Sequence, residues 1–358
     1  MPLPIPDVVG ILADNLRRRG SVLPIPARRA TRWARDLGIP RGGETVLYTG
    51  QMYQLIPYIE RLVRLEQRLG DSPLARFSGL ARRANRLVNG VALVARPPVA
   101  ERREYDRVPA NVARLLTRSG VAFGCLYEDD LYSGALAHDL GADEAVAAHA
   151  RRVAGILRRH GVREVITIDP HTTTMLRTVY PRLVEGYAVR VRSYLEVLAE
   201  RRLPVTTPLT GAVVLHDSCV YARCEGIVEE PRRLLAAAGL TVRDPESSRI
   251  RTWCCGGPAE SLFPATALAV ATQRVDQLRA VAPDCVTMCP ICLVNLGKAA
   301  DGKLRLRDIS DCLVDAIEPE ARPGGPSRDN EKGSDARPPG VSTRGRGTGP
   351  AGARAARV

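Results

Sequence analysis

The sequence predicts an α/β protein with two pseudo-symmetric halves, each containing a short parallel sheet flanked by helices. Three observations lead to this fold class. Short β-rich runs alternate with amphipathic segments, the first half repeats in the second, and the composition is that of a globular protein. The 358 residues are 45% hydrophobic and 25% charged, and this length suits about two domains.

Four short apolar runs are predicted as buried strands because they are rich in aliphatic and β-branched residues and too short for helices. They are 46–48, 164–168, 212–215 and 285–288. Amphipathic helices are predicted between the strands from apolar periodicity and from Pro and Gly at helix boundaries. Three of these helices are 72–90, 146–161 and 264–283.

An internal repeat relates the two halves. The segment 167–176 aligns with 287–296, with Thr, Pro and Leu in register, and Gln51-Met-Tyr53 aligns with Cys219-Val-Tyr221. Two prolines within 201–208 interrupt the pattern, so we expect domains at 1–205 and 206–318. The remaining segment, 319–358, is rich in Gly, Arg, Ser and Pro. We expect it to be a disordered basic tail, because it cannot bury enough apolar surface to offset its ordering entropy.

The excess of basic residues does not predict a nucleic-acid partner. Lys and Arg total 52 against 39 for Asp and Glu, which gives +13, but aromatic residues make up only 4% and no stacking motif accompanies the cations. No apolar run approaches the ~20 residues of a membrane span, and the N-terminus lacks a basic signal region. We therefore expect a cytoplasmic protein with reduced thiols and no membrane span, with peripheral association through a partner left open.

Five of the nine cysteines are confined to three loops of the second half, two of which directly follow predicted strands. They are Cys219, the adjacent pair Cys254 and Cys255, and Cys289 and Cys292. Ligand crevices of open α/β sheets lie beyond the carboxyl ends of strands, so we expect one shared crevice. Clustered thiolates select zinc, copper(I) or iron–sulfur clusters. Adjacent cysteines suit two iron atoms better than one tetrahedral zinc, which would leave one cysteine spare. Zinc and plain buried thiols remain alternatives.

The motifs His216-Asp-Ser-Cys219, Trp253-Cys-Cys-Gly-Gly-Pro258 and Met288-Cys-Pro-Ile-Cys292 resemble the cysteine-rich CCG domain of the B-type and D-type heterodisulfide reductase subunits. Iron–sulfur subunits of glycolate oxidase, lactate utilisation and anaerobic glycerol-3-phosphate dehydrogenase contain the same domain. The resemblance implies two CCG-type domains and one noncubane [4Fe-4S] cluster on the five cysteines named above. Other residues stand at the corresponding positions of the first half: Gln51, Tyr127-Glu128, Asp169 and Thr172. Domain 1–205 is therefore expected to be CCG-like without the cysteine ligands.

This resemblance implies an iron–sulfur oxidoreductase subunit that moves electrons to or from a small thiol or disulfide and is not active alone. The chain lacks the cysteine run of a ferredoxin, so a ferredoxin-like or flavin-containing subunit would exchange electrons with it. One alternative is an electron-relay subunit of a 2-hydroxyacid or glycerol-3-phosphate oxidising complex. Another is a zinc-binding, non-redox assembly protein.

Several other polar residues and cysteines have predicted roles. His216 is expected either to bond a cluster sulfur or shuttle a proton, or simply to leave the strand as a polar residue. Asp217 is expected to cap the following turn. A first-half group could form a hard-metal or substrate site, although a solvated turn is favoured: Glu128, Asp129, Asp130, Asp169 and His171. The remaining cysteines are predicted to be small buried hydrophobic residues: Cys125, Cys224, Cys285 and Cys312.

Overall fold

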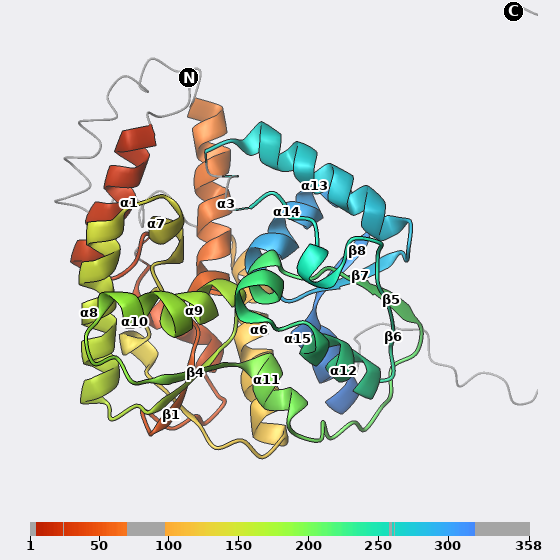
Figure 1. Cartoon of the computed structure of the whole chain (residues 1–358), viewed down its shortest axis with the longest axis horizontal. Coiled ribbons are helices and arrows are strands. Elements are labelled where there is room, and N and C mark those ends of the chain that lie inside the picture. The colour runs from red at the N-terminus through yellow and green to blue at the C-terminus, as the bar shows by residue number, and fades with distance from the viewer. Residues whose placement is uncertain (1–4, 24, 70–96, 258–259, 261, 319–358) are drawn as a thin grey trace, which may run out of the picture. The chain divides into compact units, whose positions relative to one another are not determined.

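The protein contains two parallel sheets, as the sequence predicts, and each has four strands (Figure 1). The computed structural model describes residues 5–23, 25–69, 97–257, 260 and 262–318, which belong to one compact unit. The first sheet has the order β2 (Gly124–Cys125), β1 (Thr45–Tyr48), β3 (Glu164–Thr167) and β4 (Arg190–Ser193). The second has the order β6 (Thr241–Arg243), β5 (Ala212–Leu215), β7 (Asp284–Thr287) and β8 (Arg305–Asp308).

The two sheets have the same topology, which confirms the pseudo-symmetry. Strands β1, β2, β3 and β4 correspond in order to β5, β6, β7 and β8. The four predicted strands are the central ones, where both faces are buried and the sequence is continuously apolar. The strands that the sequence did not predict all lie at sheet edges. Three of these edge strands carry arginines, as in the Arg-Val-Arg-Ser of β4, which hides their strand character.

Helices connect the strands. In the first half they are α1 (Ile5–Arg19), α2 (Ala27–Ala30), α3 (Met52–Leu69), α6 (Val99–Arg118), α7 (Ala135–Asp139), α8 (Asp143–Arg159), α9 (Pro170–Thr174), α10 (Tyr180–Leu183) and α11 (Tyr194–Ala199). In the second half they are α12 (Glu229–Ala237), α13 (Pro264–Arg279), α14 (Pro290–Ala300) and α15 (Ile309–Ile317). Short helical turns are η1 (Arg32–Ala34), η3 (Tyr127–Asp129), η4 (Met175–Val179), η5 (Tyr221–Glu225) and η6 (Arg249–Arg251).

Two of the three helix predictions are confirmed, by α8 for 146–161 and by α13 for 264–283. The predicted helix at 72–90 and the predicted tail at 319–358 lie outside the described residues. The segment between α11 and β5 joins the two sheets where the sequence places a boundary. Because the described residues of both halves belong to one compact unit, the division at 205/206 stays a prediction.

One hydrophobic core is shared by the two sheets. Alternate residues of each central strand point to opposite faces. In β3, Ile166 contributes to the shared core, whereas Val165 contributes to a core beneath the outer helices of the first half. In the second half, Leu215 and Val286 reach the shared core, and Val214 reaches a separate core under α13 and α14. The halves are therefore packed face to face through continuous apolar side chains.

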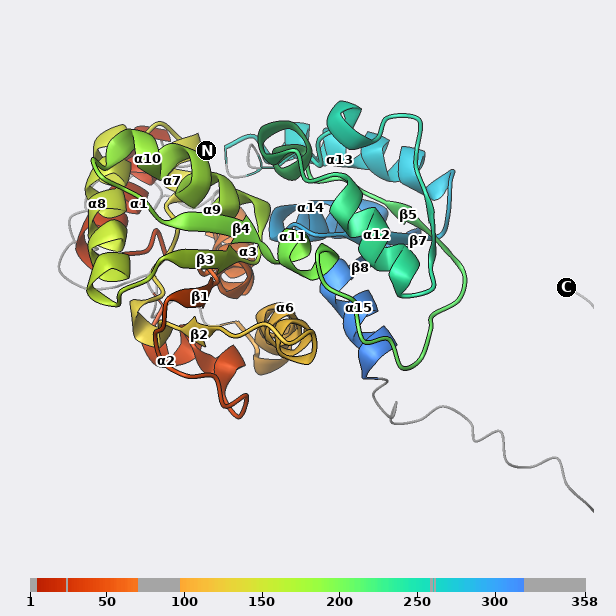
Figure 2. The same cartoon turned by 60° about the horizontal axis from the view of Figure 1, so that its bottom comes forward.

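Four helices between the sheets follow the same pseudo-symmetry. Helix α15 packs on α6 and α11 packs on α12, so each half's last helix contacts the equivalent crossover helix of the other half (Figure 2). The helical segments that follow β3 and β5, α9 and η5, also contact one another. The loops that follow these strands therefore meet between the two halves.

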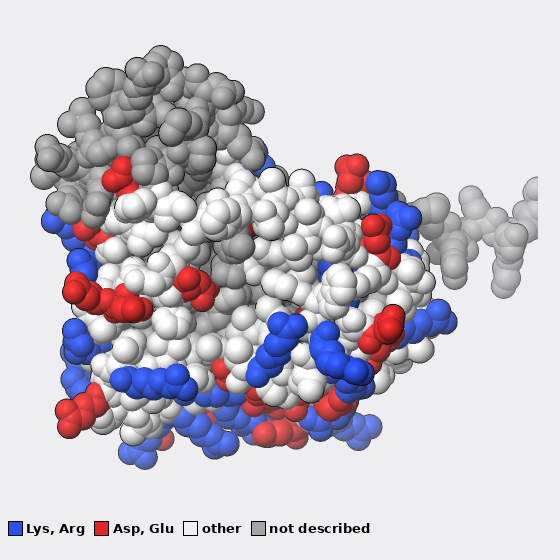
Figure 3. Space-filling view, turned by 45° about the horizontal axis from the view of Figure 1, so that its top comes forward, with Lys and Arg blue, Asp and Glu red and all other residues white. Residues whose placement is uncertain are grey.

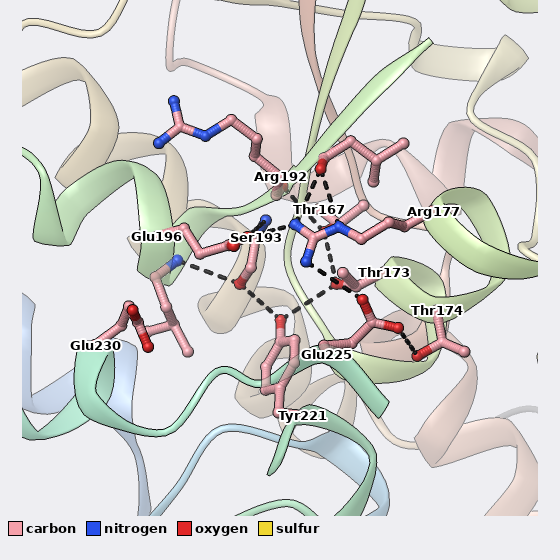
Figure 4. Close-up of polar contacts among 12 residues, drawn as sticks. Thr167, Thr173, Thr174, Arg177, Arg192, Ser193, Glu196, Tyr221, Glu225 and Glu230 are labelled. Atoms are coloured by element: carbon pink, nitrogen blue, oxygen red, sulfur yellow. Dashed lines mark hydrogen bonds and ion pairs between the residues drawn. The ribbon is translucent and has the colours of Figure 1, made fainter. Parts of the chain in front are cut away.

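A buried polar network ties these loops together (Figure 4). The Tyr221 hydroxyl, two residues after Cys219, lies 2.8 Å from Ser193 Oγ and 3.4 Å from Thr173 Oγ1. The Glu225 carboxylate is 1% exposed and accepts hydrogen bonds from Arg177 Nη1 at 3.2 Å and from a threonine of α9. Because first-half groups satisfy these buried second-half groups, the network holds the Cys219 loop in a defined place.

The charged groups on the face drawn in Figure 3 are mixed in sign. Lys and Arg alternate with Asp and Glu along its margins, and a broad area between them carries neither. Among the described residues, no helix combines the length and apolar character that crossing a bilayer would require.

Candidate metal centre

The three cysteine loops are positioned by the ends of neighbouring elements. Cys219 follows β5 directly, and Cys289 is the N-cap residue of α14, the helix that begins at Pro290. Proline at the first helical position is favourable because its missing N–H needs no partner there. Cys292 lies in the first turn of the same helix. The adjacent pair follows η6, which lies between the edge strand β6 and α13 in the chain.

The five sulfurs form one unbroken series of contacts. Hydrogen-bonding contacts join the thiols of Cys219 to Cys254, Cys254 to Cys255, Cys255 to Cys292, and Cys292 to Cys289. Cys255, Cys289 and Cys292 are each at most 2% exposed, whereas Cys219 and Cys254 are half-buried. The predicted convergence therefore occurs, and the series has a buried end and an accessible end.

The contacts between these thiols shift their pKa values in opposite directions. Donation from Cys219 and from Cys255 lowers the pKa of Cys254 well below its usual range. Burial opposes ionisation of Cys289, but hydrogen bonds from Cys292 and His171 lower its pKa as well. The pKa values of Cys219, Cys255 and Cys292 are raised, first by the contact with a neighbouring sulfur and then by burial. Ionising all five would require a compensating positive charge, which a bound metal supplies.

Two glycines allow the Cys254-Cys255 turn to pack tightly. Gly256 has φ +88°, and a Cβ there would lie 2.3 Å from the Ala267 carbonyl oxygen in α13. At Gly257 a Cβ would lie 2.1 Å from the Ile291 Cγ2 atom, inside the Cys-Pro-Ile-Cys loop. Only glycine fits at these positions. The pair of cysteines is consequently pressed against the loop that carries Cys289 and Cys292.

His216 lies near the sulfurs, as the first of its two sequence interpretations requires. One of its ring nitrogens lies within 4.8 Å of the sulfurs of Cys255 and Cys292. Its Nδ1 accepts a 3.2 Å hydrogen bond from Arg274 Nε, which places the ring proton on Nε2. That buried Nε2 has no partner among the described residues. Burial and the adjacent Arg274 lower the His216 pKa to about 3. A neutral ring of this kind is suited to donate a hydrogen bond to sulfur.

Asp217 anchors the loop through ion pairs, whereas the sequence predicted that it caps a turn. Its two oxygens accept hydrogen bonds from the Arg232 guanidinium at 2.7 and 2.8 Å, and Oδ2 also accepts from the Arg249 backbone N–H at 2.7 Å. Both side chains of the Asp217–Arg232 pair are at most 8% exposed. The guanidinium of an arginine in α12 thus takes the place of the predicted local cap. Only tertiary packing could bring this arginine to Asp217.

His171 of the first half reaches the cysteine cluster, which the sequence did not predict. Its buried ring makes a hydrogen-bonding contact with Cys289 and lies 4.0 Å from Asp139 Oδ2 through Nδ1. Burial favours the neutral ring, but the contact with Cys289 and nearby carboxylates raise its pKa to about 9. The only sequence signal was the alignment of the Asp-Pro-His segment with Cys-Pro-Ile. The favoured interpretation, a solvated turn, is wrong for His171.

The structure corrects one pseudo-equivalent position. Gly134 with φ +90° matches Gly256 with φ +88°, and each lies between an edge strand and the helix that leads to the next central strand. The residues that stand in place of the cysteine pair are therefore Tyr132 and Ser133, not Tyr127-Glu128. The 3.3 Å hydrogen bond from the Ser133 N–H to the Gly50 carbonyl keeps this turn beside the loop after β1.

The first-half acidic residues are engaged in structural contacts rather than gathered at one metal site. Asp169 caps α9 by accepting from the Thr172 N–H at 2.9 Å. Asp130 accepts from the Thr49 N–H at 2.8 Å. Glu128 and Asp129 pair with basic side chains, Arg41 and His160. Glu128 and Asp129 are not buried, whereas Asp130 and Asp169 are, so the predicted solvated turn is wrong for these two residues as well as for His171.

The four remaining cysteines differ in exposure. Cys125, Cys285 and Cys312 are buried, as predicted. Cys224 is exposed, so its predicted burial is wrong. It lies in the single helical turn η5, whose inward side is occupied by Tyr221 and Ala222.

The donor set fits a soft metal or cluster. Five sulfurs from three loops lie in contact, and the buried His216 N–H near them lacks a partner among the described residues. Sulfur ligands with an N–H donor beside them are typical of iron–sulfur sites. A single tetrahedral ion would use at most four of the five sulfurs.

Comparison with known proteins places this site in a known domain type. The family model described as a cysteine-rich domain, CCG, matches residues 213–297. The chain is 31% identical over 233 residues to an EtfAB:quinone oxidoreductase of Syntrophomonas wolfei, covering 60% of this chain and 32% of the relative. It is 28% identical over 225 residues to the probable iron-sulfur-binding oxidoreductase FadF of Bacillus subtilis, covering 59% and 32%.

A third relative is a dihydromethanophenazine:CoB–CoM heterodisulfide reductase component of Methanosarcina barkeri, the D-type polypeptide of that enzyme. It is 24% identical over 217 residues, which cover 57% of this chain and 52% of the relative. The matches therefore span between about a third and a half of these relatives. The region matched by the family model contains all five clustered cysteines. Residues 213–297 accordingly match the CCG cysteine-rich domain that the three cysteine motifs resemble.

Proposed function

We propose that the five clustered cysteines hold an iron–sulfur cluster and that the chain is an electron-transfer subunit of an oxidoreductase complex. The observation that carries this proposal is the unbroken series of sulfur contacts from Cys219 to Cys289. Five thiolate ligands, two of them adjacent in the chain, favour a noncubane [4Fe-4S] cluster. When bound, such a cluster accepts and releases electrons.

The protein's own residues would orient and insulate that group. Gly256 and Gly257 bring the adjacent cysteines against the Cys-Pro-Ile-Cys loop, and three buried sulfurs keep one side away from water. The half-buried end at Cys219 and Cys254 is where a partner or substrate would approach. His216 would donate its Nε2–H toward sulfur, which stabilises added negative charge there.

The relatives support a redox role. Their names describe a quinone oxidoreductase, an iron-sulfur-binding oxidoreductase and a heterodisulfide reductase component. Zinc draws no support from these names, and a zinc-binding assembly protein is accordingly the weaker proposal. Because the relatives are longer than the matched region, we propose that a ferredoxin-like or flavin-containing subunit exchanges electrons with this chain.

We propose two candidates for the molecule that exchanges electrons with the cluster at its half-buried end, near Cys219 and Cys254. The first is a small thiol or disulfide, suggested by the heterodisulfide reductase relative. Reduction of a disulfide to two thiols consumes two electrons and two protons, so the redox partner would have to deliver electrons twice. The second is a protein carrier, with this chain as a relay. The absence of cysteines at Gln51, Tyr132 and Ser133 favours the relay, because only one half offers a sulfur site.

Anaerobic purification followed by iron, zinc and acid-labile sulfide analysis tests the cofactor. We expect about four irons per chain, a brown colour and near-complete iron loss in Cys255→Ser. The matched control is Cys285→Ser, which removes an equally buried thiol outside the series and should retain iron. One zinc per chain without iron, or full iron in Cys255→Ser, would contradict the proposal.

The acceptor is tested by reducing the loaded protein and mixing it with either a small disulfide or an oxidised flavoprotein or ferredoxin. Under the first proposal, cystamine reoxidises the protein and two thiols appear per two electrons lost. Under the relay proposal, only the protein carrier reoxidises it. Reoxidation by neither would refute the electron-transfer function.

A further inference from the structure

We propose that His171, a residue of the half without the cysteines, is a positioning residue that donates a hydrogen bond to the Cys289 sulfur of the other half. This inference rests on the proposed function of the cysteine site, and it adds a residue from outside the CCG domain at 213–297. The first half would thereby take part in the site although it carries none of the five cysteines.

The local geometry directs His171 to this sulfur. It is the second residue of α9, after Pro170, and the helix start is fixed by Asp169, whose carboxylate accepts from the Thr172 N–H at 2.9 Å. The ring is 8% exposed and contacts Cys289, which is 1% exposed. Asp139 Oδ2 lies 4.0 Å from Nδ1 of the same ring. A buried ring that contacts both a carboxylate and a sulfur has a restricted orientation.

The repeat places His171 opposite a matching contact. His171 aligns with Ile291, and Ile291 packs against the hydrophobic core of the first half. Each half thus extends one side chain from the same loop position into the other half. The second half inserts an apolar residue into an apolar core, whereas the first half inserts a hydrogen-bond donor beside a sulfur. This difference matches the chemistry of the two receiving sites.

A buried donor at Cys289 has a definite consequence for redox chemistry. A hydrogen bond to a ligating sulfur withdraws electron density and favours the state with the greater negative charge. Because both groups are buried, water does not compete for the contact. His171 would therefore stabilise the reduced form and fix the position of the Cys289 loop relative to the first half.

The contact itself can be tested on the full chain without metal. The protein has five histidines, so their ring nitrogens give a simple long-range 1H–15N spectrum. We expect Cys289→Ala to shift the His171 ring signals, and the control Cys285→Ala, a buried thiol on β7, to leave them unchanged. An unshifted His171 signal in Cys289→Ala would overturn the inference. This readout is independent of whether the chain binds iron, so it separates a failed contact from a failed cofactor proposal.

The effect on the loaded protein is tested with two variants. At a fixed ambient potential, His171→Leu should lower the ratio of reduced to oxidised protein about tenfold, equivalent to 59 mV for a one-electron couple. His171→Gln retains an N–H donor and should change the ratio less than about threefold. His138→Leu, an exposed histidine, is the control. The positioning role is also supported if His171→Leu lowers iron retention and His171→Gln does not. Equal redox ratios and equal iron retention in His171→Leu and His171→Gln would refute the positioning role.

Discussion

The Tyr53 hydroxyl donates a 2.6 Å hydrogen bond to Asp308 Oδ2, across the interface between the two halves. The pseudo-equivalent Tyr221 makes the reciprocal contact, 2.8 Å from Ser193 Oγ. Both partners of these tyrosines, Asp308 and Ser193, are N-cap residues of the helices that follow the last strand of each sheet. Each half therefore completes a buried helix start of the other through one tyrosine. These tyrosines lie two residues after equivalent loop positions, which hold glutamine in the first half and cysteine in the second.

Replacing these tyrosines should weaken the interface between the halves. We expect Tyr53→Phe to lower the free energy of unfolding by about 1.5–3 kcal/mol, because it removes a bond to a buried carboxylate. Tyr221→Phe should cost about 1 kcal/mol. Tyr187→Phe is the control, because its buried hydroxyl has no partner among the described residues. Urea unfolding measures all three, and an unaffected Tyr53→Phe would contradict this interface.

Gly256→Ala should disrupt the cysteine turn. The added Cβ would meet the Ala267 carbonyl oxygen at 2.3 Å, and φ +88° is unfavourable for alanine. Gly226→Ala provides a matched control with φ +69° and no atom within 4 Å of the added Cβ. The control should cost about 1 kcal/mol of stability through φ alone. Gly256→Ala should cost clearly more and also reduce iron retention after anaerobic reconstitution. Equal effects of both substitutions would argue against the packing of this turn.

Removing Arg232 should leave a buried charge. Arg232→Met uncouples the 2% exposed Asp217 carboxylate from its guanidinium partner. We expect a loss of about 3–5 kcal/mol in the free energy of unfolding, because breaking one partner of a buried pair strands the other. Arg233→Met should cost less than about 1 kcal/mol, since that arginine is 60% exposed and pairs with Glu230 on the surface. Adding Asp217→Asn to Arg232→Met should recover part of the loss.

His149 should make stability depend on pH. Burial lowers its pKa from 6.5 to about 4, while Nε2 lies 2.6 Å from the Tyr132 carbonyl oxygen. Between these pH values the unfolded chain binds the proton and the folded chain does not. The folded state therefore loses stability as pH falls from 6.5 toward 4, by about 1.4 kcal/mol per pH unit.

The variant His149→Gln keeps an N–H donor and removes this titration. Its unfolding free energy, measured by urea denaturation at several pH values, should fall less steeply than that of the wild type in this window. Other titrating groups contribute equally to both proteins and cancel in the difference. Parallel pH profiles would show that His149 is not desolvated in the folded state.

Most of the central fold could be predicted from the sequence. Strands such as β1 and β5 are buried on both faces, so their residues are mostly apolar and the pattern is local. The edge strands could not be recognised, because Arg190 and Arg192 of β4 look like loop residues until the sheet pairs them with β3. The alignment of the repeat was equally local, but it misplaced the equivalent of the cysteine pair. Only the matching conformations of Gly134 and Gly256 located it.

The sequence by itself determined which residues carry the chemistry. The cysteine spacing identified the five sulfurs, and the repeat showed that the first half lacks the cysteines of the second. These are properties of residue type and order, which need no coordinates. The tertiary structure alone decided what surrounds the sulfurs. His171 and Tyr53 act across long sequence separations, and their roles arise from burial and hydrogen-bond geometry that exist only once the two sheets are packed together.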